Sequence, residues 1–201
     1  MTNATIWQLG IIFLLAALGF YGYSFWSPLV IKSLTRSSDL GVGVILAAIS
    51  ALTITFMPLN STHSDRTDER PVHVAISLLI MGVGFFGCAL LPEPRLAVLS
   101  LALIPIGHCA AYGPFWSIPT RFLTGAAAAA GVALVTTIAN VGWFLGPTLI
   151  GVMKDRLGTH GPAFMLLGVC AIIAALLALR LRRAAVISNS RSLVRVTASV
   201  E

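Results

Sequence analysis

The chain has 201 residues, of which 57% are hydrophobic and 10% are charged, against about 25% charged residues in an ordinary soluble domain. So few polar side chains cannot cover the surface of a water-soluble fold, which excludes a soluble globular domain. The formal net charge of +6 does not indicate nucleic-acid binding. Five of the thirteen Lys and Arg lie in the last 22 residues, directly after an apolar stretch, as in tails that face anionic lipid: Arg180, Arg182, Arg183, Arg191 and Arg195.

Six apolar segments are long enough to cross a bilayer as helices, since a hydrocarbon core of about 30 Å needs ~20 residues. In chain order they are residues 6–31, 40–59, 72–91, 96–119, 123–153 and 162–179. The sequence therefore predicts an all-α membrane protein, with a six-helix transmembrane domain over 1–183 and a basic cytoplasmic tail over 184–201. No Lys or Arg precedes the first segment, so we expect a retained span rather than a signal peptide.

The charges between the spans predict an orientation. One side collects eight basic residues, namely Arg66, Arg70, Arg121 and the five arginines of the tail. The other side collects five, namely Lys32, Arg36, Arg95, Lys154 and Arg156. By the positive-inside rule we expect a multi-pass protein of the cell (inner) membrane with both termini in the cytoplasm.

A short string occurs twice and indicates an internal repeat. Phe-Trp-Ser stands at 25–27 near the end of the first span and again at 115–117 near the end of the fourth. These two spans run in opposite directions, so the pair fits a three-plus-three inverted repeat. The alternative is chance, because aromatic residues gather at the ends of membrane helices.

The six spans contain no Asp, Glu, Lys or Arg, although such residues usually mark ion pathways and proton relays. His108 lies in the middle of the fourth span. It could couple protons, but we favour a neutral imidazole hydrogen-bonded to a neighbouring helix. Asn140 and Ser117 are polar residues that either satisfy neighbouring helices or line a polar cavity, and for Asn140 we favour the cavity. Gly142 and Gly146 have the spacing that lets two helices pack closely.

No pattern indicates an enzyme, a metal site or a cofactor. His63, Asp65 and Asp68 share one connection, but Arg66 and Arg70 stand among them, which favours a solvated turn with ion pairs over a metal site. The three cysteines lie inside apolar runs without metal-ligand spacing, and we interpret them as packing residues: Cys88, Cys109 and Cys170.

Residues 63–70 resemble the cytoplasmic loop motif of the major facilitator superfamily, with Ser61 and Asp68 in place of the two loop glycines. Residues 113–125 and 131–151 resemble the tenth and eleventh helices of its anion:cation symporter family, whose members carry sugar acids, tartrate and aromatic acids. Residues 19–28 look like the seventh helix of that family. The order of motifs over about residues 5–180 implies the C-terminal half of the fold, helices seven to twelve.

The resemblance implies a partial, proton-coupled secondary active transporter for organic anions that is inactive alone. Its partners would be the lipid bilayer, a missing N-terminal six-helix half, and a small organic anion and a proton as substrates of the complete protein. Tyr21, Ser117 and Asn140 would line the substrate cavity. Asp65, Arg66 and Arg70 would form a cytoplasmic gating loop, with Asp65 against the positive end of a helix in the other half. The alternative is a stand-alone structural or interaction protein of the membrane, including a homodimer.

Overall fold

The computed structural model describes residues 4–197, with side chains as far as Leu181. It contains six α-helices: α1 (Ala4–Thr35), α2 (Asp39–Thr67), α3 (Arg70–Leu90), α4 (Pro94–Trp116), α5 (Gly125–Leu157) and α6 (Gly161–Thr197). A short 3₁₀ turn, η1 (Pro119–Arg121), follows α4. All six helices are long and apolar enough to cross a membrane, which confirms the all-α fold of six spans.

Several helices pass beyond the apolar segments that identified them. The sequence placed a connection at 60–70, but α2 continues to Thr67 and ends where Asp68 adopts the left-handed conformation, with φ of 55°. The hydroxyls of Ser61 and Thr62 donate to carbonyls four residues back, at 3.0 and 2.9 Å, and so are satisfied within the helix. Likewise α6 runs unbroken past residue 179 to Thr197, and the last four residues of the expected tail lie outside the described part.

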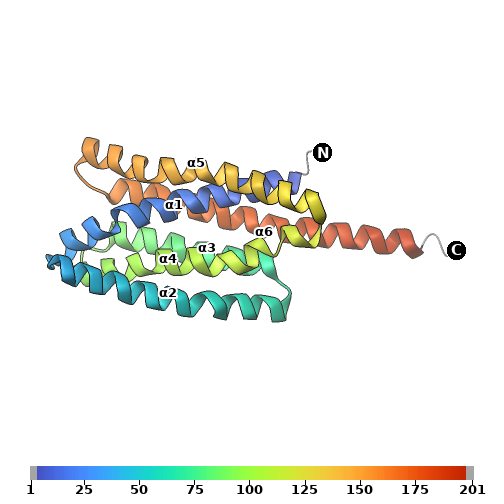
Figure 1. The fold of residues 1–201 in the computed structure, drawn as a ribbon, viewed down its shortest axis with the longest axis horizontal. Helices are drawn as coiled ribbons and strands as arrows, with labels where there is room; N and C mark the ends of the chain where they lie inside the picture. The colour runs from blue at the N-terminus through green and yellow to red at the C-terminus, as the bar shows by residue number, and fades with distance from the viewer. Residues whose placement is uncertain (1–3, 198–201) are drawn as a thin grey trace.

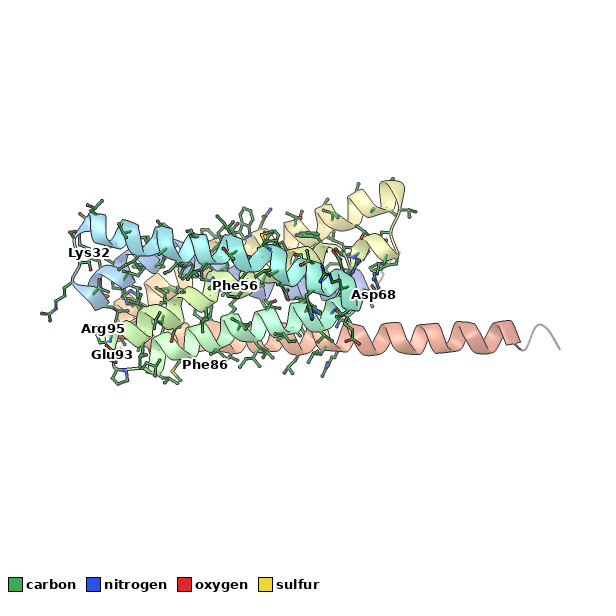
Figure 2. All side chains as sticks on the ribbon, turned by 90° about the horizontal axis from the view of Figure 1, so that it is seen from below. Lys32, Phe56, Asp68, Phe86, Glu93 and Arg95 are labelled. Atoms are coloured by element: carbon green, nitrogen blue, oxygen red, sulfur yellow. The ribbon has the colours of Figure 1, made fainter. Side chains whose placement is uncertain are left out.

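The helices form a bundle with two distinct ends (Figure 1). Both termini and the connections α2–α3 and α4–α5 lie at one end, which we call the terminal end. The other three connections lie at the opposite end. Charged side chains sit at these two ends: Asp68 at the terminal end, and Lys32, Glu93 and Arg95 at the opposite one (Figure 2).

The pattern of helix contacts repeats within the chain. Helix α1 packs mainly on α5, and α4 packs on α2 and α3, while the pairs α3–α6 and α1–α4 join the two groups. If α1 is exchanged with α4, α2 with α5 and α3 with α6, the α1–α5 pair becomes the α4–α2 pair. The pairs α1–α4 and α3–α6 are unchanged by this exchange. This is the arrangement that a three-plus-three inverted repeat produces.

Glycines bring the α1 and α5 backbones together. A Cβ at Gly142 would lie 2.6 Å from the carbonyl oxygen of Leu14, and one at Gly146 would collide with the carbonyl oxygen of Leu18. The contacts advance along both helices in the same direction, so α1 and α5 run parallel. The packing role expected for Gly142 and Gly146 is thereby confirmed.

Two helices remain largely uncovered. Within their most apolar stretches, 17% of α2 residues and 22% of α5 residues are buried inside the bundle, against 39–50% in the other four helices. On α5 the buried residues form a single narrow stripe, which includes Val135, Ala139 and Ile150. The broad exposed faces of α2 and α5 are thus available to lipid or to another protein segment.

Candidate functional site

An aromatic cluster extends across α1 from α4 on one side to α5 on the other. Its rings form a continuous series: Trp143 lies 4.3 Å from Tyr21 between ring centroids, Tyr21 lies 5.4 Å from Phe20, Phe20 stacks on His108 at 4.2 Å, and His108 lies 5.4 Å from Tyr112. We call these five residues the aromatic cluster. Its π-faces and phenol hydroxyls can contact a ligand by stacking and by hydrogen bonds, but they offer it no charge.

His108 is buried at the centre of this cluster. Its ring is 3% exposed and nearly coplanar with that of Phe20, at an interplanar angle of 7°. Among the described residues its Nδ1 has no hydrogen-bond partner, so the bond to a neighbouring helix that the sequence led us to expect is not seen at this atom. A buried nitrogen without a partner costs ~1–3 kcal/mol, so Nδ1 is an unpaired polar group inside the bundle.

Asn140 lies on the same side of α5 as Trp143, because residues three apart are neighbours on a helix. Its side chain is exposed. The hydroxyls of Thr136 and Thr137 donate to carbonyls of their own helix, both at 2.8 Å, and are therefore not free donors. Tyr21 and Asn140 thus both border the region around Trp143.

Ser117 lies apart from Tyr21 and Asn140. It caps the C-terminus of α4, nine residues after His108, which corresponds to roughly 13 Å along a helix. Its hydroxyl donates to the carbonyl of Gly113 at 2.9 Å, and its own carbonyl accepts from Nη1 of Arg70 at 3.0 Å. The structure therefore groups Ser117 with the charged residues of the terminal end.

Arg70 joins three helices at that end. Arg70 is the first residue of α3. Besides the Ser117 carbonyl at the end of α4, its guanidinium contacts the Asp65 carboxylate of α2 at 3.4 Å. Arg121 forms a second ion pair with Asp68. We call these four charged residues and Ser117 the terminal latch. The Asp65 side chain is 64% exposed while that of Arg70 is 20% exposed, so Asp65 still presents its carboxylate outward.

A histidine pair braces the latch between α2 and α3. Nδ1 of His63 lies 2.7 Å from Nε2 of His73, and Nδ1 of His73 lies 3.0 Å from the carbonyl oxygen of Glu69. Because a carbonyl only accepts, His73 carries its proton on Nδ1, and its Nε2 accepts from His63. The ion pairs expected at this connection are present, but most of it is an ordered helix end with cross-helix bonds rather than a turn.

Some of these residues could not be identified from sequence. Phe20 and Trp143 in the aromatic cluster, and His73 in the pair, carry no local pattern that marks them. Their partners stand on other helices, more than ninety residues away in the case of Trp143. The parallel packing of α1 on α5 is what brings Trp143 to Tyr21.

The comparisons with known proteins agree with this architecture. A protein of Agrobacterium vitis named "Putative tartrate transporter" is 34% identical over 185 residues, which cover 92% of this chain and 42% of that protein. "Inner membrane transport protein RhmT" of Escherichia coli (strain K12) is 31% identical, with 90% of this chain and 42% of that protein covered. "Quinolone resistance transporter" of Acinetobacter baumannii is 28% identical, with 84% and 39% covered.

The chain thus spans about two fifths of the length of these relatives. A family model described as Major Facilitator Superfamily matches residues 9–200, and the six membrane-spanning helices and their repeated contacts fit that match. The chain belongs to the Major Facilitator Superfamily.

Proposed function

We propose that this chain forms the C-terminal half of a secondary active transporter for small organic anions. The observation that carries the proposal is the uncovered state of α2 and α5, which pack on α4 and α1, the two helices that supply most of the aromatic cluster. A second six-helix half seated on these faces would enclose the cluster between two repeats, the position at which such transporters bind substrate. The length of the relatives leaves room for such a half.

The substrate class follows from the relatives, one of which is named for tartrate. Because the spans of this half carry no charged side chain, the cation that pairs with the anion's carboxylate and the group that carries a coupling proton would belong to the other half. Tyr21 and Asn140 would supply neutral hydrogen bonds from this wall. We place Ser117 in the terminal latch with Asp65 and Arg70, and we assign the latch and the neighbouring Arg66 to a cytoplasmic gate.

The isolated chain should therefore move no organic anion. We expect uptake of labelled tartrate into vesicles that hold only this chain to equal that of empty vesicles. Adding the N-terminal half of the Agrobacterium vitis relative should restore saturable, proton-dependent uptake. In that pair Asn140→Ala should weaken apparent affinity about fivefold, the effect of one lost hydrogen bond.

The matched control is Thr148→Ala, also exposed on α5, whose hydroxyl bonds to its own helix. This variant should transport as the unaltered pair does. Saturable uptake by the chain alone would overturn the proposal and would favour a self-sufficient homodimer. An unaltered affinity in Asn140→Ala would remove that residue from the substrate wall.

The orientation is a separate proposal, namely that the terminal end faces the cytoplasm. In a background with Cys88, Cys109 and Cys170 replaced by alanine, single cysteines at the exposed positions Ser38 and Thr159 should react with an impermeant thiol reagent added to intact cells. A cysteine at the exposed Arg66 should react only after the cells are opened. The reverse pattern of labelling would invert the topology.

A further inference from the structure

Pro114 leaves a gap in the hydrogen bonding of α4. Proline has no N–H, so the carbonyl of the residue four positions earlier, Ala110, loses its helical donor. Ala110 is 6% exposed and lies within a membrane span. An unpaired carbonyl in such surroundings is costly, because neither water nor lipid can replace the missing donor.

Asn60 supplies that donor from another helix. Its Nδ2 donates to the Ala110 carbonyl at 2.8 Å and to the hydroxyl of Ser77 at 3.2 Å. Asn60 stands on α2, Ser77 on α3 and Ala110 on α4, so one amide group ties three helices together. At Pro28 the repair is local instead, since the adjacent Ser27 hydroxyl faces the freed Ser24 carbonyl at 3.5 Å.

The backbones are packed closely around this junction. A Cβ at Gly113 would collide with the Ser61 side chain of α2, and one at Gly107 would collide with the Ser77 carbonyl of α3. With α2, α3 and α4 in such contact, the short Asn60 side chain reaches a carbonyl that water cannot. The bond can break only if α2 moves away from α4.

We propose that Asn60 is a positioning residue that holds the end of α4 in place by substituting for the hydrogen bond that Pro114 removes. Tyr112 lies between Ala110 and Pro114, so the same bond fixes the segment that carries this ring of the aromatic cluster. The effect on transport rests on the proposed function. The effect on the bundle itself does not.

A double-mutant cycle tests whether Asn60 replaces the hydrogen bond that Pro114 removes. Asn60→Ala in the isolated chain should lower the ratio of folded to unfolded protein in detergent micelles about tenfold, because the Ala110 carbonyl is left buried without a partner. Pro114→Ala restores a backbone N–H four residues after Ala110. In that background, removing the Asn60 amide should lower the ratio by only about twofold, since the helical bond takes over. Thr62→Ala, an exposed neighbour bonded to its own helix, should have no effect.

An equal loss in both backgrounds would overturn the proposal, since it would mean that Asn60 is an ordinary packing residue unrelated to Pro114. If Asn60→Ala alone fails to fold, the double variant decides: a folded double variant supports the proposal and an unfolded one contradicts it.

In the reconstituted pair, Asn60→Ala should raise the KM for the anion at least threefold, as expected for a lost hydrogen bond, and Pro114→Ala should restore it. A KM that stays raised in the double variant would contradict the positioning of Tyr112. If the unaltered pair moves no anion at all, the proposed function is wrong. The unfolding measurements on the isolated chain still test the role of Asn60 in that case.

Discussion

Replacing Gly146 by valine should lower the free energy of unfolding of the isolated chain by about 3 kcal/mol. The new Cβ would fall on the carbonyl oxygen of Leu18 and 3.0 Å from the backbone nitrogen of Gly22. Neither is a flexible side chain that could turn away, so α1 and α5 must separate. Their separation also opens the contact between Tyr21 and Trp143 and loosens the aromatic cluster.

Gly43→Val is the matched control. Gly43 lies on α2, and a Cβ there would meet nothing within 4 Å, so the same chemical change should alter stability by less than about 0.5 kcal/mol. Reversible unfolding in mixed micelles, followed by tryptophan fluorescence, measures the stability of both variants. Similar losses in the two variants would show that the α1–α5 contact is not the origin of the effect.

Arg70→Ala should cost about 2 kcal/mol, because it removes a charge-assisted hydrogen bond to the Ser117 carbonyl together with the contact to Asp65. Arg70→Lys should recover only part of this loss, since a single ammonium cannot copy the two directions of a guanidinium. The measurement is unfolding of the isolated chain, combined with hydrogen exchange at the end of α4, which should become faster.

Arg66→Ala is the comparison for this variant. Arg66 is exposed and forms no ion pair within the described residues, so its loss should change stability by less than about 0.5 kcal/mol. Unchanged exchange at Ser117 in Arg70→Ala would mean that the latch does not hold α4.

The six spans could be predicted because the bilayer imposes their length, and soluble domains rarely contain an uncharged apolar run of ~20 residues. The ends of the helices could not. Hydropathy falls at Asn60, yet α2 continues for seven more residues to Thr67, where Asp68 turns left-handed and donates its backbone N–H to the Ser64 carbonyl. Beyond the apolar core it is this local bonding, not hydrophobicity, that decides where a helix stops.

The candidate site was predicted only in part, for a related reason. Resemblance placed Tyr21 and Asn140 on one wall, and their position beside Trp143 is compatible with that. The same resemblance implied that Ser117 lies on this wall, whereas the structure shows it at the end of α4. Its depth depends on how far α4 is shifted along the bundle, and that shift is set by Arg70 and by close contacts with α2 and α3. Such contacts between helices leave no periodic trace in a sequence.

The confinement of charged side chains to the two ends of the bundle has an electrical consequence. A membrane potential does work only on charge that crosses it, about 2.3 kcal/mol per elementary charge for each 100 mV. Between residues 4 and 181 the apolar stretches of the six helices hold no formal charge, so a rearrangement that keeps both ends in water moves no gating charge. Any sensitivity of transport to voltage would then enter with the anion, the proton or the other half of the transporter.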